Sequence, residues 1–503
     1  MRPKRFPDWE KELKHFPLNP KGVPPKLMNS VEERIAMEAT PKRSRGKVWV
    51  AAAALLLASA VLFTQREPIM GLFKQKVETP QFDVKTERSI KVQWADGMSF
   101  MSRYGNAFII QYPNMDVDAV SSPPYDPQKE RAVQFEEFIE KEKPDVVYVP
   151  MEVYKKLADK GLLLPLDPFI QKEKYDLGVF QESVVETIRE AGGGKLYGMA
   201  PNFSTQALYY NKSLFDKYGV PYPTDQMSWE DVLALAQRFP ANGQGEDRVY
   251  GLIPYSASPY GTTESIGRTK GIGLTDADAS KMTANTDAWR SIFQFVADGV
   301  KKGWLYESKP LTGSISGADF YKRNPFLTGN AAMMVSTNST ANDLIQAKQR
   351  YNLADFAWDI VTEPVDPAKP NVSSTFRIDE IYAIPANSEN ARDGWELIKS
   401  IHSEAMTRKV ASSYTGNFGL YSRKFESRTP ITYRLEAFTM LRPDGQPSSL
   451  AIMDRPLYTS LSTIVNEELK SAAAGTKNLD DAIGAIQQRG QTAIEQAKAE
   501  KKP

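Results

Sequence analysis

The 503-residue sequence contains no cysteine and only two histidines. The absence of cysteine excludes disulfides, thiolate metal sites, a cysteine nucleophile and a lipid attached to an N-terminal cysteine. His15 and His402 stand in a polar N-terminal tail and inside an expected helix, so they form neither a His-based triad nor a multi-histidine metal site. Paired carboxylates are possible in principle, but no spacing among the 62 acidic residues singles out a pair. We therefore expect no enzyme, no metal and no cofactor.

A charge excess of either sign is also missing. The chain has 63 basic and 62 acidic side chains and a formal net charge of +1, so we expect no nucleic-acid partner. A phosphate-binding loop of the G-x-x-x-x-G-K-[ST] type does not occur, which means that any ATPase working with this chain is a separate protein. With 41% hydrophobic residues, a chain of this length can bury a large core in two or three units.

One long hydrophobic run is present near the N-terminus, from Val48 to Phe63, and Ser59 is its single polar residue. Four basic residues between positions 42 and 47 precede it, which predicts a single membrane span with a cytoplasmic N-terminus and the rest of the chain extracellular. We accordingly predict a cytoplasmic tail at 1–47, an anchor at 48–65 and a polar tether at 66–87. The alternative is a secretory signal cleaved after Ala58-Ser59-Ala60, although a basic leader of 47 residues is long for such a signal.

After residue 87, expected strands alternate with expected helices. Runs at 89–95, 145–149 and 207–210 are typical of buried strands, whereas 100–111, 229–236 and 289–300 repeat apolar residues at helical spacing. This alternation predicts an α/β protein with parallel sheets covered by helices. Ligands of such sheets bind beyond the carboxyl ends of the strands.

Six ordered blocks of sequence resemble the extracellular solute-binding proteins, family 1, of bacterial ABC importers, which mostly carry sugars. Together they span about residues 88 to 498. The blocks are GKLYGMAPNFSTQALYYNKSLFDKYGV (194–220), PDVVYVPMEVYKKLADKGLLLPLD (144–167), FLTGNAAMMV (326–335), DIVTEP (359–364), YAIPANSENARDGWELIKSI (382–401) and AAAGTKNLDDAIGAIQQRGQTAI (472–494).

The resemblance implies a type II periplasmic-binding-protein fold in residues 88–503, with a ligand cleft between two lobes. Lobe one would comprise about 88–200 and 377–440, and lobe two about 201–376 with the C-terminal helices. Closure of the lobes over a sugar or oligosaccharide would mark the loaded receptor for an ABC permease. The alternative is a membrane-spanning sensor that reports the bound solute through residues 1–47, a short tail before a single span that distantly resembles that of membrane-bound anti-sigma factors.

Strand ends and irregular loops supply the candidate ligand contacts, because sugars are bound by aromatic faces, amides and carboxylates. The candidates are Trp94, Asp96, Met151, Glu152, Asn202, Ser204, Thr205, Tyr255, Tyr260, Asn338, Ser339, Arg377 and Asp379.

Several candidates have a structural alternative. Trp94 suits a core position equally well, Asp96 and Glu152 suit helix N-termini, and Arg377 with Asp379 suits an ion pair between lobes. Residues 336–339 stand where many sugar-binding members have a Gly-Pro-Trp-like turn. This departure favours a smaller or decorated sugar, or a solute that is not a sugar.

Overall fold

The computed structural model describes residues 85–500, except 127–128, 242, 244–247, 310–312, 314–315, 354, 413–419, 426–431 and 445–454. The chain divides into two units, Met1–Glu78 and Thr79–Pro503, and the described residues all lie in the second. The predictions for the tail, the membrane anchor and most of the tether therefore lie outside the described residues. In the part of the chain that is described, no helix combines the length and the apolar character needed to cross a membrane.

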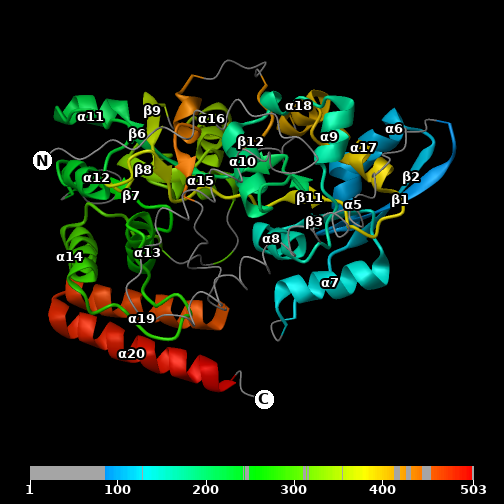
Figure 1. Cartoon of the computed structure of the whole chain (residues 1–503). Coiled ribbons are helices and arrows are strands. Elements are labelled where there is room, and N and C mark those ends of the chain that lie inside the picture. The colour runs from blue at the N-terminus through cyan, green and yellow to red at the C-terminus, as the bar shows by residue number, and fades with distance from the viewer. Residues whose placement is uncertain are drawn as a thin grey trace, which may run out of the picture. The chain divides into compact units, whose positions relative to one another are not determined.

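A first sheet of five strands has the order β2-β1-β3-β11-β4. Its strands are β1 (Arg88–Trp94), β2 (Met115–Ser121), β3 (Val146–Val149), β4 (Gly198–Met199) and β11 (Ile381–Ala383). The helices associated with it (Figure 1) are α5 (Gly97–Phe100), α6 (Asn106–Gln111), α7 (Arg131–Glu142), α8 (Met151–Asp159), α9 (Asp167–Glu173), α10 (Glu182–Ala191), α17 (Ala391–Ile401) and α18 (Glu404–Ser412). A five-residue π-helical turn, Met101–Gly105, joins α5 to α6.

A second sheet of four strands has the order β7-β8-β6-β9. Its strands are β6 (Gln206–Asn211), β7 (Tyr250–Ile253), β8 (Ala331–Thr337) and β9 (Trp358–Thr362). All six residues of β6 are buried, as expected of a central strand with both faces covered. The helices on this side are α11 (Lys212–Tyr218), α12 (Trp229–Ala236), α13 (Pro259–Thr269), α14 (Asp287–Lys302), α15 (Gly317–Lys322) and α16 (Ser339–Tyr351).

The two sheets are mixed, and the prediction of parallel sheets was wrong in this respect. In the first sheet β1 pairs parallel with β2 and β3, but β11 runs antiparallel to β3 and to β4. In the second sheet β6 is antiparallel to both β8 and β9. The antiparallel strands adjoin the segments that cross between the sheets. A strand that arrives from the other sheet needs no helical crossover and is free to pair in the antiparallel sense.

Two of the segments that connect the sheets pair with each other, and we call them the crossing segments. The first runs from β4 through β5 (Asn202–Phe203) to β6, and the second from β10 (Val372–Ser373) to β11. Their backbones meet at Ser204 and Arg377, where each N–H donates to the other residue's carbonyl at 2.8 Å. Three short elements follow later in the chain: β12 (Leu420–Tyr421), which pairs with β5; β13 (Arg442–Pro443), which pairs with β10; and the 3-10 turn Leu435–Phe438.

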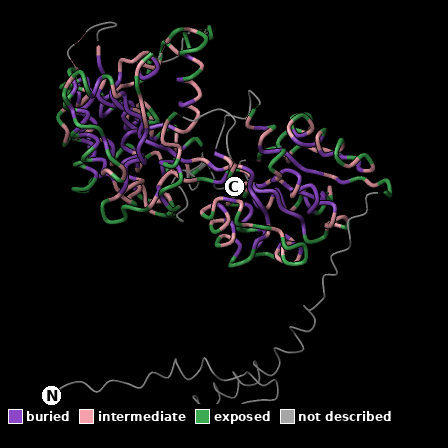
Figure 2. Tube along the Cα trace, turned by 90° about the horizontal axis from the view of Figure 1, so that it is seen from above, coloured by how far each residue is buried: buried purple, intermediate pink, exposed green. Residues whose placement is uncertain are grey.

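The chain ends in two long helices, α19 (Arg455–Ala473) and α20 (Leu479–Glu500), which lie side by side (Figure 1). α19 packs against α13 and α14, and its apolar residues Leu457, Leu461 and Val465 join the hydrophobic core of the second sheet. Buried residues follow the strands and the inner faces of the helices, while exposed ones gather on loops and outer faces (Figure 2). α13 thus lies between α14 and α19 on one side and the crossing segments on the other.

Candidate functional site

A cavity of about 760 Å³ lies beside the paired crossing segments. Its walls come from residues 204–206 and 372–377 of the two crossings, from α13, from the loop at 271–277 and from Tyr458 on α19. These segments are far apart in the sequence, so the cavity exists only in the folded chain.

Helix α13 presents a polar face to the cavity. Ser258 caps its N-terminus by accepting a hydrogen bond from the Gly261 N–H at 3.0 Å, and Pro259 occupies the first turn, where a missing N–H costs nothing. The i, i+4 spacing then places Glu264 above Arg268, with Arg268 Nη1 and Glu264 Oε1 3.5 Å apart. The next face carries Ser265 and Thr269, whose hydroxyls donate to backbone carbonyls one turn earlier.

The charged pair on α13 is incompletely satisfied. Burial raises the pKa of Glu264, and the positive charges of Arg268 and Arg377 oppose that rise. Among the described residues, Glu264 Oε1 and Arg268 Nε are buried without a hydrogen-bond partner, and so is Ser204 Oγ on the crossing segment. Buried polar atoms are normally hydrogen-bonded, so wall residues whose polar atoms have no hydrogen-bond partner suit a polar ligand.

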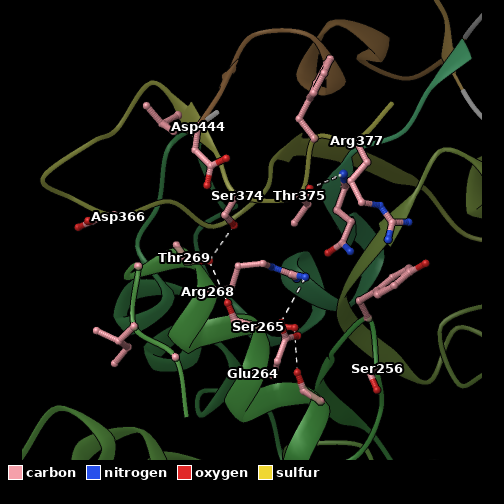
Figure 3. A pocket seen from close by; sticks show the side chains of 18 of the residues that line it. Ser256, Glu264, Ser265, Arg268, Thr269, Asp366, Ser374, Thr375, Arg377 and Asp444 are labelled. Carbon is pink, nitrogen blue, oxygen red and sulfur yellow. Dashed lines mark hydrogen bonds and ion pairs between the residues drawn. The ribbon is translucent and has the colours of Figure 1, made fainter. Parts of the chain in front are cut away.

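Arg377 reaches the cavity from the wall opposite α13. Its backbone is fixed by the paired hydrogen bonds to Ser204, but its side chain is exposed and has no carboxylate within 4.0 Å among the described residues. Figure 3 shows Arg268 rising from α13 and Arg377 descending from the crossing segment toward the same space. Tyr255, 49% exposed, lines the same cavity and offers a ring and a hydroxyl. The cavity thus combines guanidinium groups, hydroxyls and an accessible aromatic ring.

Comparison with known proteins decides the family. The model of the bacterial extracellular solute-binding proteins matches residues 98–407, more than half of the chain. The chain belongs to this family.

A relative in Rhizobium meliloti (strain 1021), the sn-glycerol-3-phosphate-binding periplasmic protein UgpB, is 21% identical over 356 residues, covering 67% of this chain and 77% of the relative. Two solved structures confirm the two-lobe α/β fold of this solute-binding protein. One is an extracellular solute-binding protein family 1 member from Alicyclobacillus acidocaldarius (TM-score 0.57, 15% identity, 82% of this chain and 100% of that one). The other is a sugar transporter from Rhizobium etli in an open conformation (TM-score 0.53, 19% identity, 80% and 99%).

Four of the candidate contacts named from the sequence line the cavity of this solute-binding protein: Ser204, Thr205, Tyr255 and Arg377. Tyr260, by contrast, is only 3% exposed and packs edge-to-face on Tyr458, with ring centroids 5.4 Å apart. The difference follows from α13, which begins at Pro259 and turns the Tyr260 side chain into the core.

The candidates at the first sheet lie elsewhere. Trp94 is 8% exposed and its Nε1–H donates to the Tyr382 hydroxyl at 2.7 Å, inside an aromatic cluster. Asp96 caps α5 by accepting from the Ser99 N–H at 3.1 Å, and it lines a separate hollow formed with α5 and β2. Met151 and Glu152 form the first turn of α8. None of these four lines the cavity.

The remaining candidates flank the crossing segments. Asn202 lies on β5, and its amide group is 3.4 Å from a carboxylate oxygen of Glu380, which is paired with Arg103 at 3.6 Å. Asn338 and Ser339 lie at the start of α16, and Asp379 is exposed one residue before Glu380. The cavity wall contains their neighbours Thr337 and Arg377 instead.

Sequence reasoning missed most of the α13 wall. Among the residues not foreseen are Glu264, Ser265, Arg268 and Thr269 of α13, and Ser374, Thr375 and Tyr458 elsewhere in the wall. For α13 the sequence does carry a signal. Ser258 and Pro259 form a typical helix start, and the segment PYGTTESIGRT (259–269) repeats polar side chains at i, i+4 spacing, which indicates a helix with a polar inner face. For Tyr458 no local signal exists, because α19 reaches the cavity only through tertiary packing.

Proposed function

We propose that this chain is the extracellular substrate-binding subunit of an ABC importer and that it binds a carbohydrate-like solute in the cavity. The observation that carries the proposal is that three residues of the cavity wall have a buried polar atom with no hydrogen-bond partner among the described residues: Ser204 Oγ, Glu264 Oε1 and Arg268 Nε. The chain that forms this cavity belongs to a family of solute-binding proteins. A carboxylate and a guanidinium each pair with neighbouring sugar hydroxyls, and such pairs fix the orientation of a ligand.

The apolar part of the wall suits the same class of ligand. Tyr255, Phe376 and Tyr458 supply aromatic surface, and Phe376 is held in place by stacking on Phe203 at a centroid distance of 5.3 Å. Sugar rings bury their apolar faces against such rings. A binding site for a small polyhydroxylated solute is expected to combine aromatic side chains of this kind with a polar helix face.

A second candidate ligand is a polyol that carries a phosphate or carboxylate group. Arg377 favours it, because its guanidinium points into the cavity with no carboxylate within ion-pair distance among the described residues. Planar guanidinium groups bind such anions through two parallel hydrogen bonds. The glycerol-3-phosphate-binding relative is consistent with this ligand class.

Two further carboxylates of the wall have hydrogen-bond donors of their own. Asp276 accepts a hydrogen bond from the Lys281 N–H at 3.0 Å, and Asp366 accepts one from the Ala368 N–H at 3.0 Å. Each of these side chains therefore stabilises its own turn. Glu264 forms an ion pair with Arg268, with Oε1 and Nη1 3.5 Å apart.

Thermal unfolding of the full chain in detergent with maltotriose, glycerol and glycerol 3-phosphate tests both ligand classes. A ligand that binds the folded state raises the melting temperature by mass action. A shift with maltotriose that survives Arg377→Met supports the neutral sugar. A shift with glycerol 3-phosphate that Arg377→Met removes, but Arg350→Met on the exposed end of α16 does not, supports the anionic polyol. The absence of any shift across a wider panel of sugars and sugar phosphates would refute the proposal.

We further propose that the lobes close over the solute and deliver it to a permease with a separate ATPase, and that residues 48–65 anchor the chain to the membrane. Support comes from the basic residues before the apolar run and from the absence of a cysteine for lipid attachment. Membrane fractionation and protease treatment of intact cells test the topology. Digestion of residues 88–503 with protection of an N-terminal tag is the expected result. The sensor alternative depends on residues 1–47, which lie outside the described residues, and we do not adopt it.

A further inference from the structure

Glu363 is a fully buried carboxylate next to the cavity but outside its wall. It directly follows β9, and it is 1% exposed. The register of β9 against β6 places it beside the first crossing segment, because Thr362 pairs with Ala207. Burying a carboxylate is costly unless hydrogen bonds satisfy it, so the partners of Glu363 indicate what the charge is used for.

Glu363 accepts its hydrogen bonds from the second crossing segment. Its Oε1 accepts from the Ser374 N–H at 2.8 Å and from the Thr375 N–H at 3.3 Å, and its Oε2 accepts from the Thr375 hydroxyl. Burial raises the pKa of Glu363, and these hydrogen bonds, one with Ser373 and the charge of Arg268 oppose that rise. Arg268 is the charged group of the cavity wall that faces it.

The residues that Glu363 holds are themselves parts of the cavity wall. Thr375 Oγ1 accepts from the Gln206 N–H at 2.9 Å and lies 3.2 Å from Thr205 Oγ1, so one hydroxyl joins the two crossing segments. Ser374 Oγ lies 3.1 Å from Thr269 Oγ1 on α13 (Figure 3). Since the Thr375 hydroxyl donates to Glu363, its lone pairs are turned toward Gln206.

We propose that Glu363 is a positioning residue of the binding site: from behind the wall, its carboxylate holds Ser374 and Thr375 against the first crossing segment and against α13. The proposal rests on the proposed function in so far as it concerns affinity. The site geometry then depends on a side chain that touches no solute. Removal of the carboxylate first loosens the second crossing segment, which loses its hydrogen bonds to Glu363. The hydrogen bond from the Gln206 amide then weakens as well, because its acceptor, the Thr375 hydroxyl, is no longer held in place.

Amide hydrogen exchange in the unliganded full chain tests the positioning role without any ligand. We expect Glu363→Gln to lower the protection of the Ser374, Thr375 and Gln206 amides by about tenfold or more, as expected for the loss of hydrogen bonds to a charged acceptor. The Gln206 amide is decisive, because it donates its hydrogen bond to the Thr375 hydroxyl and not to Glu363. Glu396→Gln is the matched control, since Glu396 is a buried carboxylate hydrogen-bonded to Tyr112 and Arg392 in the first lobe.

Protection of Gln206 within twofold of wild type in Glu363→Gln would overturn the proposal, and so would an equal loss in Glu396→Gln. If Glu363→Gln does not fold, Glu363→Asp takes its place, because it keeps the charge and shortens the reach to Thr375; the same loss is expected. A second measurement adds Thr375→Val. Its effect on the Gln206 amide and that of Glu363→Gln should not add, because both act through one hydroxyl.

Calorimetric titration with maltotriose and with glycerol 3-phosphate tests the consequence for binding. For whichever probe binds the wild-type chain, we expect the Kd to rise about tenfold in Glu363→Gln and to stay unchanged in Glu396→Gln. An unchanged Kd in Glu363→Gln would overturn the role in affinity. If neither probe binds wild type, the wider panel of sugars and sugar phosphates decides the proposed ligand classes, and the exchange measurement still decides the positioning role.

Discussion

Replacement of Trp94 by alanine distinguishes a ligand contact from a core residue. In the structure Trp94 is 8% exposed, its indole N–H donates to Tyr382 at 2.7 Å, and its ring lies 5.8 Å from that of Tyr148 and 6.1 Å from that of Phe100. Truncation of such a buried aromatic costs about 3–5 kcal/mol. It also leaves the buried Tyr382 hydroxyl without its donor, which adds on the order of 1 kcal/mol.

A loss of about 4 kcal/mol corresponds to a fall in melting temperature of roughly 8 °C or more, at about 2 °C per kcal/mol for a large domain. Thermal unfolding of the unliganded chain, followed by near-ultraviolet circular dichroism, measures the fall directly. Trp94→Phe keeps a ring and loses the hydrogen bond, so its melting temperature should fall by less than half as much. Phe320→Ala, at a side chain that is 56% exposed, is the control and should leave the melting temperature nearly unchanged.

An unliganded Trp94→Ala protein that unfolds within about 2 °C of wild type would refute the core assignment, because that fall corresponds to only about 1 kcal/mol. Loss of a ligand-induced shift in that protein would then restore Trp94 as a candidate contact. The outcome bears on the first lobe as a whole, because Trp94 and Tyr382 join the end of β1 to β11.

Two further predictions concern acid stability and the N-terminal tail. His402 is buried with Nδ1 2.7 Å from the Ile398 carbonyl oxygen, and burial lowers its pKa to about 4. The unfolded chain takes up this proton near pH 6.5, so the contribution of His402 to stability is complete above that pH and is lost as the pH falls toward 4, by about 3 kcal/mol at most. Urea unfolding at pH 7.5 and 4.5 should show a smaller acid loss in His402→Gln than in wild type, and equal losses would contradict the assignment. Deletion of residues 2–40 should leave solute uptake by intact cells unchanged, whereas loss of solute-dependent gene induction with intact uptake would point to the sensor function.

Local sequence patterns locate strands of both sheets but not their pairing. β1, β3 and β6 lie within about one residue of their expected positions, because apolar β-branched and aromatic runs report burial directly. The direction of pairing depends on partners more than a hundred residues away, as with Ala383 of β11 beside Val147 of β3. No periodicity in either segment carries that information.

The candidate site was likewise predictable where local sequence patterns decide and unpredictable where distant partners decide. Ser204 and Arg377 are predictable from the sequence, because polar residues in an irregular segment at an expected crossing have few structural roles other than contact with a ligand. Tyr255 and Tyr260 look equivalent in a Pro- and Gly-containing stretch, yet the helix that starts at Pro259 separates them, leaving one in the cavity and one in the core. Glu363 has no such local signal. Its role depends on three hydrogen bonds to a segment eleven or twelve residues further along, and only the folded chain shows them.

The cavity lies where the two crossing segments pair, so the proposed ligand contacts and the connection between the lobes share residues. Ser204 and Arg377 both line the cavity, and their backbones hold the two crossings together. A solute that bonds to both side chains therefore acts directly on the segments about which the proposed closure turns. Binding shifts a conformational equilibrium only by its differential affinity for the two states. If the lobes close as proposed, contacts at the crossing would supply that difference, because rotation about the crossing segments would change the geometry there before it changed the interior of either sheet.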